Sequence, residues 1–133
     1  MKPAKTFLPV LAITLLFSST AFSAQRDVLK HSTPLMRAKL QTGFMKKQLN
    51  LTRNQTEQVM AINLKYAKEM EPVIKANGGK LMKLRQASAI RKAKDAELMK
   101  VLSPGQYEAY QASKKQMREQ MIDKIMHERG PAR

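Results

Sequence analysis

The chain repeats one short pattern, Leu-Thr-Arg-Asn-Gln at residues 51–55 and Leu-Ser-Pro-Gly-Gln at residues 102–106. A Thr or Ser followed three positions later by Gln is a capping box. Its hydroxyl accepts a hydrogen bond from the backbone N–H of the glutamine, and the glutamine side chain accepts one from the N–H of the Thr or Ser. Two of the four unpaired N–H groups at a helix start are satisfied in this way. Pro104 falls at the first helical position. A proline is tolerated there because the N–H that it lacks would have no partner within the helix. Each copy therefore predicts the start of a helix.

Apolar residues recur at helical spacing around the two copies. We expect four helices, near residues 34–49, 53–76, 80–101 and 104–128. The segment Asn77–Gly79 is the clearest helix breaker. It predicts a helix C-cap and a tight turn, which makes the second and third helices an antiparallel hairpin.

Helical periodicity also assigns residues to the helix interiors. Pro72 lies inside the second helix, where a proline usually produces a kink. The third helix carries Leu81 and Leu84 on its predicted apolar stripe, and the polar residues 25–33 are expected to be loosely structured. No run with the period of a strand follows the N-terminal segment. The sequence thus predicts an all-α fold, an elongated antiparallel helical hairpin of about four helices.

Residues 1–24 have the pattern of a secretory signal peptide. Lys2 and Lys5 are followed by an apolar run, Phe7 to Phe17, and by small residues up to Ala24. The apolar run is shorter than the ~20 residues that cross a bilayer. We expect a cleaved signal at 1–24, one helical domain at 25–133 and no transmembrane segment after cleavage. An uncleaved anchor is the alternative.

The composition is strongly basic. The chain has 25 Lys and Arg against 10 Asp and Glu, and loss of Lys2 and Lys5 with the signal leaves a net charge of +13. Such a charge attracts nucleic acid, anionic lipid or acidic protein segments, and export argues against nucleic acid as the physiological partner. Without cysteine there are no disulfides, so a helical core, a second subunit or both must hold the domain. A thin layer of amphipathic helices leaves apolar stripes exposed to solvent. Because a second copy of the chain could cover them, we expect a homodimer.

Catalytic and metal-binding signals are weak. There is no Cys, no Ser/His/Asp set, no paired carboxylates and no Gly-rich phosphate loop, so we expect no enzymatic activity and no cofactor. His31 and His127 lie near opposite ends of the mature chain, without a ligand-type His or Cys at helical spacing. No metal site is expected. The many Met residues fall on apolar stripes, which favours packing over soft-metal binding.

With these features, the chain resembles the Spy/CpxP family of periplasmic proteins, which carry Leu-Thr-x-x-Gln motifs. The first copy matches that motif in full, and the second has Ser in place of Thr. The resemblance covers residues 34–128. It implies a cradle-shaped homodimer, a location in the periplasm of a Gram-negative bacterium, and an ATP-independent chaperone that binds unfolded or aggregation-prone proteins.

The resemblance also leaves two alternative functions open. One branch of the family regulates envelope stress by binding the periplasmic domain of a sensor kinase, and related proteins respond to metals. The family's motif residues are structural, and they correspond here to Leu51, Thr52, Gln55, Leu102, Ser103 and Gln106.

Client binding is assigned to the basic third helix, where Lys and Arg stems and neighbouring apolar side chains offer reversible contact. The candidate residues are Lys80, Met82, Lys83, Arg85, Ile90, Arg91, Lys92 and Lys94. The competing interpretation is a solvated basic face without a special role. A third possible function is binding to an anionic surface, of lipid or of stray nucleic acid.

Overall fold

The computed structural model describes residues 27–128 of the chain. Its four long helices are α2 (Pro34–Leu49), α3 (Arg53–Lys75), α4 (Lys80–Val101) and α5 (Pro104–Glu128). No strand occurs within the described residues, so the expected all-α fold is confirmed. The signal-peptide prediction for residues 1–24 lies outside them.

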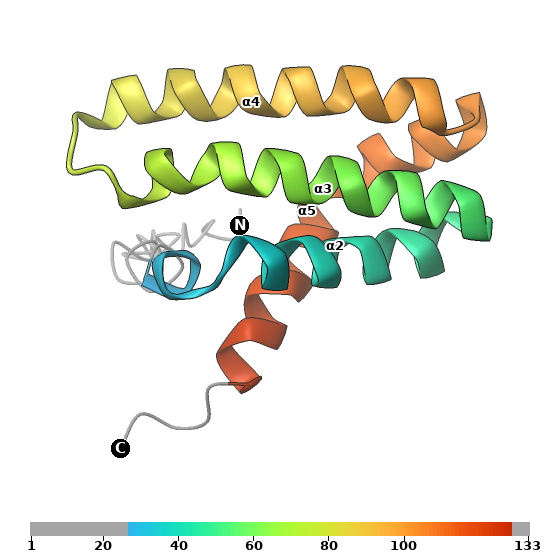
Figure 1. Cartoon of the computed structure of the whole chain (residues 1–133), viewed down its shortest axis with the longest axis horizontal. Helices are drawn as coiled ribbons and strands as arrows, with labels where there is room; N and C mark the ends of the chain where they lie inside the picture. The colour runs from blue at the N-terminus through green and yellow to red at the C-terminus, as the bar shows by residue number, and fades with distance from the viewer. Residues whose placement is uncertain (1–26, 129–133) are drawn as a thin grey trace, which may run out of the picture.

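The helices form a thin layer with one crossing helix. Helix α3 lies between α2 and α4, and each pair is antiparallel and joined by a short connection (Figure 1). Helix α5 turns back from the end of α4, passes behind α3 in this view and packs against α2 (Figure 1). Because α5 contacts α4 only weakly, α4 is packed mainly against α3.

The helix starts follow the capping signals. Thr52 caps α3 with a complete capping box, and Thr33 accepts a hydrogen bond from the Met36 N–H at the start of α2. The end of α2 is an Asn in the left-handed conformation, Asn50 with φ 50°, which Asn tolerates better than most residues. Local chemistry therefore sets these boundaries.

Two local expectations differ from the structure. Helix α3 ends on Ala76 in an extended conformation, so the predicted C-cap and tight turn at Asn77–Gly79 are replaced by an open, extended connection. Residues 27–31, expected to be loose, are helical. Pro72 lies inside α3, as predicted, and the helix continues past it to Lys75.

The core gathers at the end of the molecule where the two motif copies lie. Its main cluster of buried side chains draws on all four long helices and consists of Met45, Leu49, Leu51, Val59, Leu98, Leu102, Tyr110 and Met117. A second cluster joins Val28 to Ile122 and Ile125 of α5. These packed residues provide the hydrophobic driving force for the fold.

Helix α4 is poorly covered over its first half. Only Ala87 and Leu98 of α4 are buried, whereas Leu81 and Leu84 are exposed over more than half of their surface. Both leucines belong to the predicted apolar stripe of this helix, and the structure leaves this part of the stripe uncovered. Periodicity marked them as apolar, but α3 is the only helix packed along this part of α4, and it does not reach them.

A buried ion pair fixes the N-terminal segment to the hairpin. The guanidinium of Arg37 in α2 pairs with Glu71 of α3 and also donates to the carbonyl oxygens of Leu29, Ser32 and Ala67. Lys75 contacts the second oxygen of Glu71 at 2.8 Å. Residues 29–32 are therefore anchored beside the C-terminal half of α3.

Replacing Glu71 with Gln should lower the free energy of unfolding by about 2 kcal/mol, because Arg37 stays buried without its counter-ion. Burial raises the pKa of Glu71, but the hydrogen bonds from Lys75 and Arg37 outweigh it and hold that pKa below the ordinary 4.5. The unfolded chain therefore takes up protons first on acidification. The stabilisation is complete above pH 4.5 and is lost as pH falls through the folded pKa.

Urea unfolding followed by circular dichroism at pH 7 and at pH 3 measures this effect, and the difference from wild type should narrow at the lower pH. Glu57→Gln is the matched control, since the Arg53–Glu57 pair is exposed and should contribute less than about 0.5 kcal/mol. An equal loss in both variants would contradict the assignment.

Candidate functional site

The two motif copies meet through their glutamines. Gln55 Nε2 donates to Gln106 Oε1 at 2.7 Å, and Gln106 Nε2 donates to Gln55 Oε1 at 3.1 Å. Each Oε1 also accepts the N–H of its own cap residue, Thr52 at 3.1 Å and Ser103 at 3.0 Å. Each cap hydroxyl accepts in turn from the N–H of its own glutamine. Both capping boxes therefore form, and the two boxes are joined side to side.

The remaining amide hydrogens bind the ends of the other helices. Gln55 Nε2 donates to the carbonyl of Val101, the last residue of α4, at 3.2 Å. Gln106 Nε2 donates to the carbonyl of Leu49, the last residue of α2, also at 3.2 Å. Each glutamine thus caps the start of its own helix and the end of the helix that precedes the other copy. The pair satisfies polar groups at four helix termini.

Two acidic residues of α4 connect it to its neighbours. Asp95 accepts from Tyr110 Oη at 2.9 Å and from Lys114 Nζ at 2.6 Å, which ties α4 to α5. Burial and the Asp95 carboxylate raise the pKa of Tyr110. Glu97 accepts from Tyr66 Oη of α3 at 2.7 Å and pairs with Lys65. The hydrogen bonds from Lys65 and Tyr66 lower the pKa of Glu97.

The eight candidate client-binding residues do not share one face of α4. At 100° per residue, positions seven apart share a face. Lys83 and Ile90 share the half-buried side, and Arg85 and Lys92 share an exposed side. The exposed candidates are Lys80, Met82, Arg85, Arg91 and Lys92, and the half-buried ones are Lys83, Ile90 and Lys94.

Lys94 is the least accessible cation of the group. It is half-buried, and its Nζ donates to Gln41 Oε1 of α2 at 2.8 Å. Burial lowers the pKa of Lys94 to about 8. The positive charge of Lys114 lowers this pKa further, and the negative charge of Asp95 opposes the shift. Arg118 of α5 also has a lowered pKa, caused by burial and by Arg91. Helices α4 and α5 therefore bring like charges together.

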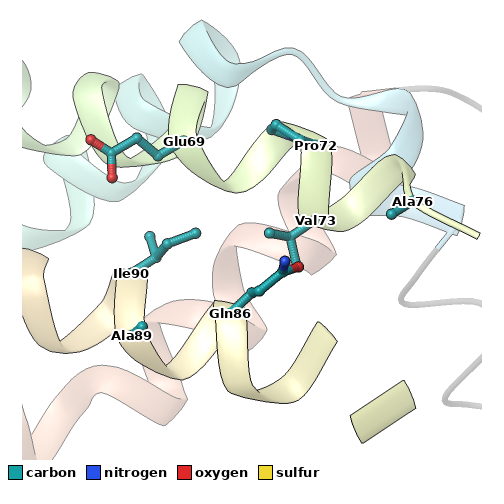
Figure 2. Close-up of a pocket in the computed structure, with 7 residues that line it drawn as sticks. All are labelled: Glu69, Pro72, Val73, Ala76, Gln86, Ala89 and Ile90. Atoms are coloured by element: carbon teal, nitrogen blue, oxygen red, sulfur yellow. The ribbon is translucent and has the colours of Figure 1, made fainter. Parts of the chain in front are cut away.

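An apolar groove runs between α3 and α4 near their connection. It has a volume of about 490 Å³, and the residues that line it are Glu69, Pro72, Val73, Ala76, Gln86, Ala89 and Ile90. Figure 2 shows Val73 of α3 and Gln86 of α4 side by side in the groove, with Ile90 beneath Glu69. Of the candidate residues, only Ile90 lines it.

Two further properties concern membranes and metals. No helix among the described residues is long and apolar enough to cross a membrane. Within the same residues, no three His, Asp or Glu side chains gather closely enough to hold a metal ion.

Comparison with known proteins places the chain in a family. The model of a domain of unknown function, DUF4890, matches residues 21–110, which is more than half of the chain. The chain belongs to the DUF4890 family. The match includes both motif copies and the whole α3–α4 hairpin, and it ends in the first turns of α5. No curated protein and no solved structure matches the chain.

Sequence reasoning missed the contact between the motif copies. It predicted each capping box alone, although Gln55 and Gln106 occupy the same position in two copies of one pattern. Their equivalent positions could have indicated the contact. Each glutamine caps a helix beside the core, so the remaining hydrogens of its amide group need acceptors, and the other glutamine can supply one. In this DUF4890 member the two motif copies therefore join the connection between α2 and α3 to the connection between α4 and α5.

Gln55→Ala and Gln106→Ala should each lower the free energy of unfolding by about 1–2 kcal/mol, since each leaves helix-end groups unpaired. The double variant should show a coupling energy on the order of 1 kcal/mol, because either substitution already breaks the shared amide pair. Urea unfolding of the four proteins measures the cycle. Gln58→Ala, at an exposed position one turn further along α3, is the control and should change little. If the two single changes in the free energy of unfolding simply add up in the double variant, the two glutamines do not act together.

Lys94→Gln should remove a pH dependence of stability. With a folded pKa of about 8 against the ordinary 10.5, folded Lys94 loses its proton first as pH rises. The unfolded chain then binds more protons, so this lysine makes wild type gain stability between pH 8 and 10.5. From pH 7 to pH 9.5 the gain relative to Lys94→Gln should be about 2 kcal/mol by urea unfolding. The exposed Lys92→Gln should follow wild type, and a parallel profile for Lys94→Gln would refute the assignment.

Proposed function

We propose that this DUF4890 protein is an ATP-independent chaperone of the bacterial periplasm, related to the Spy/CpxP family, that binds unfolded proteins on α4. The observation that carries the proposal is the uncovered surface of α4. Of its 22 residues only Ala87 and Leu98 are buried. Exposed cations and exposed apolar side chains alternate along the rest of the helix, with Met82 and Met99 both more than half exposed.

The charge distribution supports this assignment. Residues 72–94 contain seven Lys and Arg and no Asp or Glu. Positive charge of this density attracts acidic segments over a distance of about a Debye length, which is ~8 Å at physiological ionic strength. Flexible Met and Lys side chains then give adaptable apolar contact without a fixed partner shape. Nothing in this scheme requires a nucleotide.

The accessible centre of the proposed surface lies midway along α4. Arg91 and Lys92 are exposed there, and Arg118 of α5 adds a further charge beside Arg91. Lys94, which hydrogen-bonds Gln41, serves the packing of α4 and not its open surface. The resemblance to the Spy/CpxP family further supports a homodimer, in which two such surfaces would face one client.

The test is suppression of aggregation without ATP. Residues 25–133, at equimolar ratio, should suppress light scattering by reduced α-lactalbumin, an acidic client, more than by reduced lysozyme, a basic one. Arg91→Glu/Lys92→Glu should raise the half-suppressing concentration about threefold or more, since charge reversal turns attraction into repulsion.

Lys115→Glu/Lys124→Glu is the matched control, because both residues are exposed on α5 and the change in net charge is the same. The control should behave like wild type, and circular dichroism should show all variants folded. Failure of wild type to suppress scattering at low salt would refute the chaperone function. Saturable binding to one sensor domain, without general suppression, would favour a regulator instead.

A further inference from the structure

The hairpin tip combines exposed apolar side chains with positive charge. We define the hairpin tip as residues 76–85, the connection after α3 and the first turns of α4. Leu81, Met82 and Leu84 are exposed there by 62, 60 and 53%. They are half of the large apolar side chains that are strongly exposed in the described residues, and they lie within four consecutive positions. An apolar concentration of this kind marks an interaction surface.

Helix geometry directs these side chains outward past the tip. In an α-helix every Cα–Cβ bond tilts toward the helix N-terminus. The N-terminus of α4 is the tip itself, where α4 begins after the connection at one end of the layer (Figure 1). Side chains of the first turns of α4 therefore point away from the body of the protein. Those near the end of α3 point back toward it.

The charge at the tip has one sign. Lys80 and Arg85 are exposed, Lys83 is half-buried, and no acidic residue occurs between Glu71 and Asp95. Glu71 is itself neutralised by Arg37 and Lys75. Helix α4 begins at Gly79 without a side-chain cap and without acid in its first turn, which leaves the positive end of its dipole uncompensated. The apolar side chains are thus surrounded by positive potential.

We propose that the hairpin tip is a contact site for anionic phospholipid bilayers. Its three apolar side chains enter the headgroup boundary, and its basic side chains bind lipid phosphates. Short apolar groups flanked by Lys and Arg are the chemistry of interfacial membrane binding, in which burial and attraction to anionic lipid add. A convex tip of three side chains is too small for a stable protein interface, which needs about 800 Å² per partner.

The path of the chain agrees with this placement. Residues 29–32 are held by Arg37 beside Ala67 and Glu71, in the half of α3 that leads to the tip. The described chain therefore begins at the end of the molecule that carries the tip (Figure 1). Asp27 lies ten positions after Phe17, the end of the apolar run expected to act as a signal. Ten residue steps span at most ~36 Å, so a signal held in the bilayer would keep the folding domain near it until cleavage.

Cosedimentation with vesicles tests the proposal on residues 25–133, because residues 1–24 would partition into lipid by themselves and both core clusters lie beyond them. Binding should be strong to vesicles with 30% phosphatidylglycerol, weak to pure phosphatidylcholine, and should fall as salt rises. Lys80→Ser/Arg85→Ser should weaken the partition coefficient about 10- to 30-fold, at roughly fivefold per cation. Lys46→Ser/Lys47→Ser, at the far end of α2, should weaken it less than about threefold.

The apolar contribution has its own matched pair of variants. Leu81→Ser/Met82→Ser/Leu84→Ser should lower partitioning about tenfold or more, as expected for the loss of three side chains from the interface. Leu35→Ser/Met99→Ser/Met126→Ser changes three other exposed apolar side chains and should stay within about twofold of wild type. The exposure of all six positions predicts unchanged folding, which circular dichroism checks.

A direct readout of insertion uses the absence of cysteine from the chain. An environment-sensitive dye on Met82→Cys should shift its emission to the blue on addition of phosphatidylglycerol vesicles, and the same dye on Met99→Cys should not. No shift at Met82, equal shifts at both positions, or equal binding to neutral vesicles would overturn the proposal. So would a triple tip variant that keeps full vesicle binding and loses only aggregation suppression, which would assign the tip to unfolded protein.

The two proposals can fail separately. The chaperone function depends on Arg91 and Lys92 in the middle of α4, and it is measured by light scattering without lipid. The membrane contact depends on the tip and is measured without a client. The partition coefficient of Arg91→Glu/Lys92→Glu should stay within about fivefold of the wild-type value, because distant charge alone has an effect of that size. That result supports the tip as the membrane contact. A loss as large as that of the tip variants would contradict it.

Discussion

The fold depends on the amide pair between Gln55 and Gln106. Their two side chains hold the starts of α3 and α5 and the ends of α2 and α4 at one point. Helix ends within a packed core are costly unless their N–H and C=O groups find partners. A primary amide has both a donor and an acceptor, so one residue type can satisfy both kinds of terminus. Glu would keep the capping box but lose the donor that reaches the second helix.

This joint divides the molecule into two ends of different character. Leu51, Leu102 and Tyr110 pack around it, and all four long helices contribute to the cluster there. Away from the joint α4 has little cover, and the residues of its first half are mostly exposed. Segments with few buried contacts open more easily than packed ones. The adaptable surface of the protein therefore lies at the end opposite its fixed point.

Much of the fold could be predicted because its signals are local. Capping boxes and apolar spacing placed α2, α4 and α5 to the residue, since a cap and its helix are close in sequence. The course of α5 across α2 could not be predicted, because it depends on Tyr110 and Lys114 meeting Asp95 and on Ile125 meeting Val28. The open connection at Asn77–Gly79 was also missed. Glycine permits a left-handed turn but does not require one.

The candidate site was predictable in composition but not in arrangement. Cations, Ala and Leu occur on every side of α4, so its periodicity could not show which side α3 covers. Packing decided it. Lys83, Ile90 and Lys94 turned toward the neighbouring helices, and Leu81 and Leu84 toward solvent. Lys94 is kept charged near neutral pH despite its burial, at a cost to stability that Gln41 and Asp95 reduce. The buried Lys94 and the exposed leucines at the tip are thus two places in α4 where the sequence does not follow the packing of the fold, and proteins tend to depart from that packing at functional sites.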